Sequence, residues 1–300
     1  MDKLDAIRTF VRVVERRSFA LAAQDLAIPR SRASEIVQRL ERHLGIRLLA
    51  RTTRQVFPTA EGEEYYARCR TILADMDAAD QAVTASVPGG PLRINVHGTF
   101  ARHFLLPEIP VFLNLYPGIQ LHVGESDRFV DLVTEGIDCV IRVGEPEENG
   151  LICRRLGTLT EGTFASPAYL EKRGVPSSPE DLEGHQMIAF MSTKTRAIIP
   201  LEFSCSSGVK IINAPINVTV NAAESMVVLG LMGLGLIQVP KYRLADELSA
   251  GSIVEVLQDY RPVPSPVYIL HPHNRHVSSR ARAFMDWVVP ILTDKLLTEQ

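Results

Sequence analysis

A short proline- and glycine-rich segment, Val87-Pro88-Gly89-Gly90-Pro91, divides the 300-residue chain into two parts. Proline and glycine at this density interrupt helices and strands, so the segment predicts a linker. The part before it carries apolar residues at helical spacing, whereas the part after it alternates strand-like and helix-like runs. Because 300 residues exceed the usual length of one domain, at least two folded units are expected.

The first part predicts three short helices, a hairpin and a long helix. Ser18 is a good N-cap for the second helix, and Ala27-Ile28-Pro29 ends that helix. Gly45 suits the C-terminal end of the third helix. Residues 47–58 suit a short hairpin, and residues 59–83 predict one long helix. The inward stripe of the third helix consists of Ala33, Ile36, Val37, Leu40 and Leu44.

Charge is unevenly divided along the chain. Residues 1–58 carry 12 Lys and Arg against 6 Asp and Glu, and the remaining residues carry 20 against 29. A basic first part on an acidic second part indicates that the first part binds a polyanion. The same charges could instead hold the two parts against each other, and charge alone does not separate these hypotheses.

The face of the third helix opposite its apolar stripe carries side chains suited to DNA. Hydroxyl, amide and guanidinium groups hydrogen-bond base edges and phosphates in a major groove. The hairpin adds the run Arg51-Thr52-Thr53-Arg54, which suits backbone or minor-groove contacts. Taken singly, each residue is explained by a solvated helix face, but together they predict a winged helix-turn-helix. The polar face consists of Ser31, Glu35, Gln38 and Arg42, flanked by Ser34 and Arg39.

Two sets of residues carry a resemblance to a known family. In the first part they are Phe10, Val14, Ser18-Phe19, Ala22-Ala23, Leu26, Ser34, Leu40-Glu41, Leu44-Gly45, Leu48-Leu49, Arg51 to Arg54, Thr59 and Gly62. In the second part they are Leu92-Arg93-Ile94, Leu106-Pro107, Tyr116-Pro117, Asp138 to Gly144, Arg154 to Gly157, Gly233 to Leu236, and Phe284. With these residues the chain resembles the LysR-type transcriptional regulators over almost its whole length.

The resemblance implies an α/β multidomain fold. A winged helix-turn-helix DNA-binding domain is expected over residues 1–58 and a linker and dimerisation helix over 59–87. Residues 88–300 are expected to form a two-lobed α/β effector domain that resembles periplasmic solute-binding proteins. The chain would cross between lobes near Thr160–Phe164 and Pro264–Tyr268. Lobe I would then span about 92–161 and 266–300, and lobe II about 162–265.

The resemblance also implies which residues contact DNA. Base-reading positions fall on Arg30, Ser31, Ser34 and Glu35 at the start of the third helix. In the LysR-type family, glutamine is common at the position of Arg30, and arginine or lysine is frequent at the position of Glu35. Arginine favours guanine, whereas glutamate accepts from cytosine N4 and repels phosphates, so an operator unlike the family average is expected. The full predicted set is Arg30, Ser31, Arg32, Ser34, Glu35, Gln38, Arg39, Arg51, Thr52, Thr53 and Arg54.

Alternation of element types beyond the linker predicts an α/β body with mainly parallel sheets. The expected strands are 92–96, 120–123, 138–143, 162–165, 187–189, 217–220, 234–239 and 267–271. The expected helices are 107–116, 127–135, 167–172 and 224–232.

Four places in the body are candidate effector contacts. Gly98-Thr99-Phe100 opens a helical stretch, where free N–H groups and a hydroxyl suit a carboxylate, although Thr99 could instead only cap its helix. Arg142 ends an apolar strand, so its charge needs a partner: an anionic ligand or a structural carboxylate such as Asp138. In similar family members the Gly98 turn lines the effector cleft, and the resemblance adds Ser166 and Asn221 as residues near that cleft.

Other motifs do not indicate an enzyme, a metal or a cofactor. No nucleophile and base occur in a known arrangement, and Gly230, Gly233 and Gly235 precede a strand, unlike a dinucleotide-binding loop. His271-Pro272-His273-Asn274-Arg275-His276 is a weak metal pattern, because no carboxylate or thiol lies nearby. We therefore expect no catalytic residues, no metal ligands and no cofactor.

The four cysteines form no C-x-x-C pair, which favours a reduced, cytoplasmic protein. Cys205 is a conceivable redox site, but no second cysteine lies close to it in sequence. The longest apolar run, 226–239, is too short to span a bilayer, and the first residues lack the layout of a secretory signal, so no membrane partner is expected. The other three cysteines are expected as core fillers: Cys69, Cys139 and Cys153.

We predict a regulator that binds double-stranded promoter DNA and senses a small, anionic metabolite. The resemblance implies self-association as a dimer and homotetramer, and RNA polymerase as a further partner. One alternative is an α/β solute-binding or enzymatic protein whose basic head is a docking module. A second alternative is a regulator without a ligand, its cleft closed by its own side chains.

Overall fold

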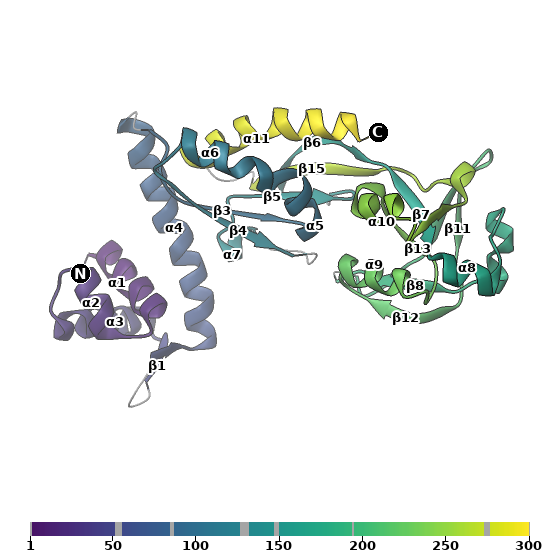
Figure 1. Cartoon of the computed structure of the whole chain (residues 1–300). Helices are drawn as coiled ribbons and strands as arrows, with labels where there is room; N and C mark the ends of the chain where they lie inside the picture. The colour runs from purple at the N-terminus through teal and green to yellow at the C-terminus, as the bar shows by residue number, and fades with distance from the viewer. Residues whose placement is uncertain are drawn as a thin grey trace.

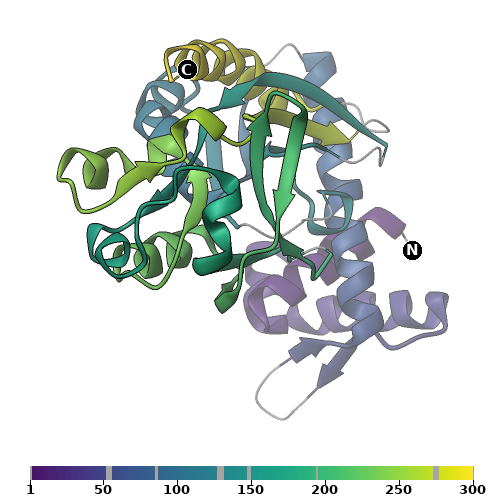
Figure 2. The ribbon, with the colours of Figure 1, turned by 90° about the vertical axis from the view of Figure 1, so that its right-hand side faces the viewer.

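The computed structural model describes residues 2–51, 56–84, 87–126, 132–146, 150–193, 195–272 and 277–299. A helical head leads through one long helix into a body of two α/β lobes (Figure 1). Figures 1 and 2 both place the hairpin of the head at the opposite end of the molecule from the last helix. This arrangement confirms the predicted α/β multidomain fold.

The head has the elements predicted from the sequence. The Ser18 hydroxyl accepts a hydrogen bond from the N–H of Leu21, and Gly45 ends the third helix at a φ of +72°. Ala33, Val37 and Leu40 of the predicted stripe are buried against the first two helices. The elements are α1 (Lys3–Arg16), α2 (Phe19–Asp25), α3 (Arg30–Leu44), β1 (Leu49–Arg51) and β2 (Val56–Pro58).

The long helix α4 (Ala60–Thr84) belongs to the hydrophobic core of the head at its start. The rings of Tyr65 and Phe10 lie 5.6 Å apart, and Cys69 is fully buried beside them. The Thr59 hydroxyl accepts from the N–H of Gly62 at 3.0 Å, which caps the first turn. Further along, α4 contacts lobe I at two helices, α7 (Leu132–Glu135) and α11 (Ser279–Thr298).

Lobe I is built on a five-stranded sheet in the order β4-β3-β5-β15-β6. Its main core contains Phe100, Phe104, Phe112 and Phe284, which join the sheet to a helical stretch and to α11. Figure 1 shows α6 and α11 above the sheet and α7 below it. The strands are β3 (Gly90–Val96), β4 (Ile119–Glu125), β5 (Cys139–Val143), β6 (Leu151–Leu159) and β15 (Ser265–Pro272). The helical stretch comprises α5 (Gly98–Phe100), η1 (Ala101–Leu105), η2 (Leu106–Glu108) and α6 (Ile109–Leu115).

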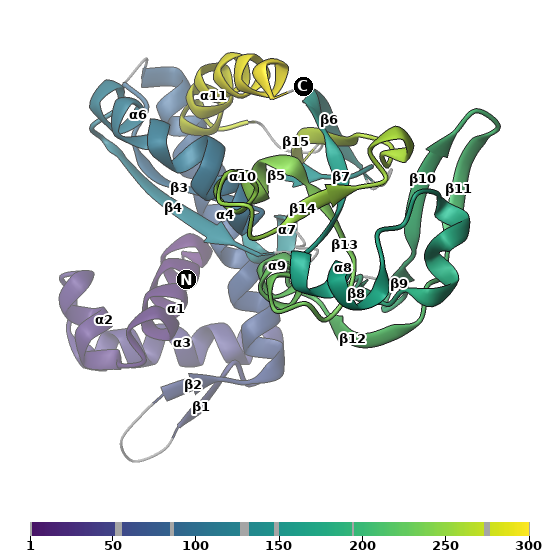
Figure 3. The same ribbon diagram turned by 45° about the vertical axis from the view of Figure 1, so that its right-hand side comes forward.

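Lobe II contains two three-stranded sheets, β13-β7-β14 and β12-β8-β9, and a separate hairpin of β10 and β11 that projects from the lobe (Figure 3). Its strands are β7 (Glu161–Ala165), β8 (Met187–Met191), β9 (Ile198–Ile199), β10 (Leu201–Cys205), β11 (Gly208–Ile212), β12 (Ile216–Val220), β13 (Ile237–Pro240) and β14 (Val254–Val256). Its helices are α8 (Pro167–Arg173), η3 (Pro179–Gly184), α9 (Ala223–Leu231), η4 (Lys241–Leu244), α10 (Ala245–Ser249) and η5 (Gln258–Tyr260).

The prediction of mainly parallel sheets is wrong. Among the described strands, β3 pairs in parallel with β4 and β5, and β8 with β12, but the other pairs are antiparallel. The chain leaves lobe I through β6 and returns through β15, so these two long strands run in opposite directions and pair with each other. Elements not predicted from the sequence include β6, β14, the β10–β11 hairpin and α11.

One of the three cysteines predicted in the core lies at the surface. Cys69 and Cys139 are buried, but Cys153 is exposed on β6, the edge strand of the lobe I sheet. The neighbouring residues Ile152, Arg154 and Arg155 are exposed as well, so nothing in the described residues covers this half of the strand. The apolar residues next to Cys153 in the sequence therefore do not indicate burial, and the prediction of Cys153 in the core is wrong.

The remaining expectations concern metal ions and membranes. Among the described residues, no cluster of three or more His, Cys, Asp or Glu could hold a metal ion. His273 to His276 of the weak metal pattern lie outside the described residues. No helix in the described part of the chain is both long and apolar enough to cross a bilayer.

Glu161 lies at the first crossing between the lobes, where β7 begins. Burial raises the pKa of its carboxyl to about 7, although a hydrogen bond with Ser265 and the charge of Arg243 both act to lower it. Ser265 begins β15 at the return crossing, so the carboxyl lies between both connections.

We expect the stability of the body to fall as pH rises from about 4.5 to about 7, because the unfolded chain releases the Glu161 proton first. Glu161→Gln should remove this dependence and raise the unfolding free energy by up to roughly 3 kcal/mol at pH 8, with little effect at pH 5. Urea unfolding at both pH values measures this, with Glu171→Gln on the exposed face of α8 as the control. Equal stabilisation at both pH values would contradict it.

Candidate DNA interface and effector cleft

The start of α3 presents the predicted base-reading residues to solvent. Arg30, Ser31, Arg32 and Glu35 are exposed and Ser34 is partly buried. Gln38 and Arg39 continue the exposed face, on the side opposite the buried stripe. Figure 3 shows α3 and the β1–β2 hairpin together at the end of the head remote from α11. The helix face and the hairpin can therefore approach one DNA duplex together.

Glu35, which departs from the pattern of the resembling family, is paired within the helix. The Arg39 guanidinium donates to its carboxylate across one helical turn. Such an exposed pair adds little stability, but it partly neutralises the carboxylate. While this pair persists, the repulsion between Glu35 and DNA phosphates is reduced, but the Arg39 guanidinium is less available to contact DNA itself.

Glu41, near the end of α3, holds the hairpin against the helix. Its Oε1 accepts from the backbone N–H groups of Leu48 at 2.9 Å and Leu49 at 3.0 Å. The Thr59 hydroxyl donates to the carbonyl of Arg47 at 2.8 Å, which joins the start of the hairpin to the start of α4. This positioning role was not predicted from the sequence. A carboxylate near a helix C-terminus is electrostatically unfavourable, so the presence of Glu41 there indicates that hydrogen-bond donors lie close to it.

The hairpin strands pair antiparallel, with Arg51 opposite Val56. The N–H of Val56 also donates to the carbonyl of Arg17, at 3.4 Å, and the Arg17 guanidinium lies over the Phe57 ring. These contacts anchor β2 to the end of α1. Thr52, Thr53 and Arg54 lie outside the described residues, as does the side chain of Arg51, so their DNA contacts remain predictions.

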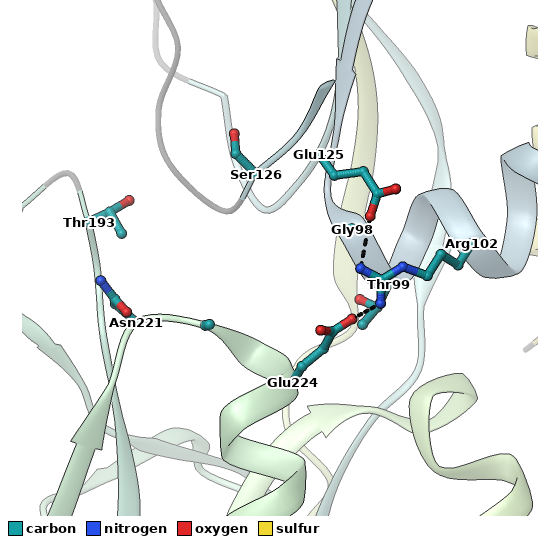
Figure 4. A pocket seen from close by; sticks show the side chains of 9 residues that line it. Gly98, Thr99, Arg102, Glu125, Ser126, Thr193, Asn221 and Glu224 are labelled. Carbon is teal, nitrogen blue, oxygen red and sulfur yellow. Dashed lines mark hydrogen bonds and ion pairs between the residues drawn. The ribbon is translucent and has the colours of Figure 1, made fainter. Parts of the chain in front are cut away.

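A cavity of about 330 Å³ lies between the two lobes, with polar residues on both sides (Figure 4). Gly98, Thr99 and Asn221 of the predicted effector set line it. Gly98 follows the end of β3, and Glu125 ends β4, so the carboxyl ends of two parallel strands meet at the cavity. The remaining lining residues are Arg102, Ser126, Thr193, Ala222 and Glu224.

Arg102 connects the lobes across this cavity. Its guanidinium donates to Glu125 of lobe I at 2.9 Å and to Glu224 of lobe II (Figure 4). The two carboxylates raise the pKa of Arg102, and all three side chains are substantially exposed at the mouth of the cavity. Exposed ion pairs of this kind are weak, so a ligand can exchange with them at low cost.

A second contact between the lobes involves Thr99. Its hydroxyl lies 3.2 Å from the phenol oxygen of Tyr242, which belongs to lobe II and is buried against Phe104 and His103. The N-cap position of α5 is His97, so the Thr99 side chain joins the lobes and does not act as that cap.

Arg142 does not line the cavity but is connected to it. Its Nη2 donates to Oδ1 of Asn95 at 2.5 Å, and the same oxygen accepts from the Ser126 hydroxyl at 3.3 Å. Asp138 is the structural carboxylate proposed from the sequence as an alternative partner of Arg142. It precedes Arg142 by four residues, about 13 Å of extended chain, and accepts from the N–H of Arg93. Arg142 therefore positions Asn95 and, through it, Ser126.

Besides Arg142, two predicted effector residues are not among those that line the cavity. The Phe100 side chain is fully buried in the core of lobe I. Ser166 is 3% exposed and caps α8, where its hydroxyl accepts from the N–H of Tyr169 at 3.3 Å. Neither residue is among the described residues that line the cavity, and a role in ligand binding remains a prediction for both.

The charged residues of the cavity were missed, although the sequence carries a signal for each. Arg102 follows Thr99 by three residues and Glu224 follows Asn221 by three, so each pair shares a helical face. Glu125-Ser126 ends the strand next to the one that leads into Gly98, and ligands of parallel sheets gather at such strand ends. Thr193 carries no comparable signal.

The fold and the two sites define a DNA-binding transcriptional regulator with an effector-binding domain. The model of the bacterial regulatory helix-turn-helix proteins of the lysR family matches residues 4–63, and that of the LysR substrate binding domain matches residues 85–291. The chain belongs to the LysR family of transcriptional regulators.

Named relatives and solved structures agree with this assignment. The HTH-type transcriptional regulator YhjC of Escherichia coli is 39% identical, covering 99% of this chain and 100% of that protein. CrgA of Neisseria meningitidis is 33% identical over 97% of this chain and 98% of its own. The solved structure of CrgA has a TM-score of 0.60 at 31% identity, covering 96% of this chain and 98% of that one. Full-length AphB of Vibrio cholerae has a TM-score of 0.61 at 27% identity, with the same coverage. These relatives are named as regulators and not as enzymes.

Proposed function

We propose that this regulator reads DNA through the exposed face at the start of α3 and responds to a small anionic effector in the cavity between its lobes. It acts in the cytoplasm as a homotetramer, and RNA polymerase is its further partner. The start of α3 supports the first part, because Arg30 and Ser31 are exposed there, Ser34 is partly exposed, and the β1–β2 hairpin lies at the same end of the head (Figure 3).

The single observation that supports the proposal of an anionic effector is the position of Arg102. Its guanidinium spans the cavity, and its partners among the described residues are two exposed carboxylates, so a ligand carboxylate can replace one of them. Hydroxyls of Thr99 and Ser126 and the amide of Asn221 supply further hydrogen bonds from both lobes. A ligand that takes Arg102 away from Glu224 changes the contact between the lobes, and so the shape presented to the partner subunits.

The two carboxylates favour a second candidate, a zwitterion such as an α-amino acid. Glu125 and Glu224 together outnumber Arg102 among the described lining residues, so a free anion would meet net negative charge. A ligand that carries an ammonium group as well as a carboxylate would satisfy both carboxylates and the guanidinium.

Glu224→Gln separates these candidates. For a simple anion the variant frees Arg102 and removes repulsion, so affinity should rise several-fold. For a zwitterion it removes an ammonium partner, so affinity should fall about tenfold. Thermal shift and calorimetry with small carboxylates and α-amino acids measure this, with Glu171→Gln as the control. No response to any compound in the wild type or in Arg102→Gln would instead favour a cleft closed by its own side chains.

The DNA face is tested with the full chain and the DNA upstream of its own gene. We expect sequence-preferring binding that weakens steeply with salt, and a loss of about 5- to 100-fold in Arg30→Ala or Ser34→Ala. Fluorescence anisotropy at several salt concentrations measures both. Arg68→Ala is the matched control, because Arg68 is exposed on α4 and pairs with Glu64. Equal affinity for random DNA would contradict the assignment of the α3 face.

A further inference from the structure

A second cavity, of about 430 Å³, lies where the head meets lobe I. Its walls come from α1 and α2 of the head, from α4, and from β3 and α11 of lobe I. The volume falls within the range of small-molecule sites. It shares no lining residue with the cavity between the lobes. Its charged lining consists of Arg8, Arg12, Arg70, Arg93 and Arg280, with Glu15.

Arg280 is the residue that most needs a ligand at this place. It is 3% exposed, and its Nε has no hydrogen-bond partner among the residues that the structure describes. It also stands in the first turn of α11, where the helix dipole is positive and disfavours a cation. A buried guanidinium with an unsatisfied donor in a positive potential is costly unless an anion compensates it.

Two further guanidinium groups reinforce this positive potential. Arg93 is partly buried, and burial together with the nearby charge of Arg70 lowers its pKa, while the charges of Asp138 and Glu15 oppose the shift. The Arg70 guanidinium stacks over the Tyr66 ring at 5.6 Å, which fixes its position on α4.

The acidic residue in the lining does not balance these groups. Glu15 forms an ion pair with Arg12 at 3.2 Å, and Arg12 also lies 3.7 Å from Asp25 of α2. Arg8 has a partner as well. The carboxylate of Glu15 is therefore engaged by the head, while Arg70, Arg93 and Arg280 approach from α4 and lobe I.

We propose that this cavity binds a small polyvalent oxyanion of the phosphate class. Guanidinium groups bind phosphate oxygens in bidentate fashion, and three of them from two parts of the molecule match an anion with several oxygens. The bound anion holds α4 against lobe I, and α1 packs against α4. It thus fixes the orientation of α3 relative to the effector domain, through a site separate from the cavity between the lobes.

The test uses pyrophosphate as the probe and the full chain without DNA. We expect saturable binding by calorimetry and a rise in thermal stability, both weakened at least tenfold in Arg280→Met and in Arg93→Met. Arg280→Met should be as stable as the wild type or more so without the probe, because it removes a buried guanidinium whose Nε has no partner among the described residues. Arg68→Met on α4 and Arg32→Met on α3 are matched controls that should bind like the wild type. ADP serves as a second probe, and tighter binding than pyrophosphate would identify a nucleotide as the source of the phosphates.

Several outcomes would overturn the proposal. Pyrophosphate binding that is unchanged in both Arg280→Met and Arg93→Met would place the anion elsewhere. Loss of binding in Arg102→Gln alone would assign it to the cavity between the lobes. Loss in Arg32→Met alone would assign it to the DNA face. A change of oligomeric state in Arg280→Met, without pyrophosphate binding in the wild type, would mean that an acidic segment of a second copy fills the cavity. The DNA and effector experiments above are independent of each of these results.

Discussion

Glu41→Ala is expected to lower the affinity for promoter DNA at least tenfold, although Glu41 does not need to touch DNA. Removing the carboxylate leaves the N–H groups of Leu48 and Leu49 without their acceptor. Both residues are buried, so water does not readily replace it. Hydrogen bonds to charged groups contribute about 1.5 to 3 kcal/mol each, so we expect the hairpin to lose about 3 kcal/mol of local stability.

Hydrogen exchange of the Leu48 and Leu49 amides gives the direct readout, and anisotropy gives the loss of DNA affinity. Glu41→Gln keeps an acceptor oxygen and should restore most of both. Glu61→Ala, at an exposed position in the first turn of α4, is the control for removing an acidic residue from this region. If Glu41→Ala exchanged and bound DNA like the wild type, the hairpin would have to be held by β1–β2 pairing and the Arg17 contacts alone.

The head was predictable because its signals are local. Caps, breaks and apolar spacing lie within a few residues of each other, and Ser18, Pro29 and Gly45 each mark a boundary that the structure shows. The contribution of Glu41 was less visible, because its partners lie seven and eight residues away, beyond the end of its own helix.

The body was predictable in outline but not in strand direction. Alternation of strands and helices suggests parallel connections, yet β6 and β15 pair antiparallel across more than one hundred residues. Such pairing depends on where the chain leaves and re-enters lobe I, which no local pattern records. The β10–β11 hairpin is hard to predict for a different reason, since Val209 and Ile211 share one face of β11 and that apolar face is exposed, so the strand has no core-facing apolar side.

Some of the residues that line the cavity between the lobes could be predicted from the sequence. Gly98 and Thr99 are predicted from a helix start and Asn221 from the family resemblance, and Arg102 and Glu224 follow Thr99 and Asn221 by helical spacing. What the sequence could not supply is that these helices face each other, because α5 and α9 belong to different lobes. The cavity where the head meets lobe I could not be predicted for the same reason, since Arg70, Arg93 and Arg280 come from three separate stretches of the chain.

Gly62→Ala should be the most disruptive single change in the DNA-binding part. A Cβ at this position would lie 2.0 Å from the carbonyl oxygen of Leu48 and 2.9 Å from its carbon. Because the obstacle is backbone, no side chain can rotate away, so α4 must move from the hairpin. That movement breaks the hydrogen bond from the N–H of Thr59 to the same Leu48 carbonyl, now 3.0 Å.

The expected cost of Gly62→Ala is about 3 kcal/mol or more, at the upper end for overpacking, with DNA affinity lost along with the orientation of the hairpin. Urea unfolding followed by circular dichroism and anisotropy measure the two effects. Gly184→Ala is the matched control, because a Cβ there meets no atom within 4 Å and its backbone is not left-handed, so stability should change little or rise slightly. Glycine-to-alanine changes with equal effects at both positions would mean that chain flexibility, and not the close approach of α4 to β1, accounts for the loss.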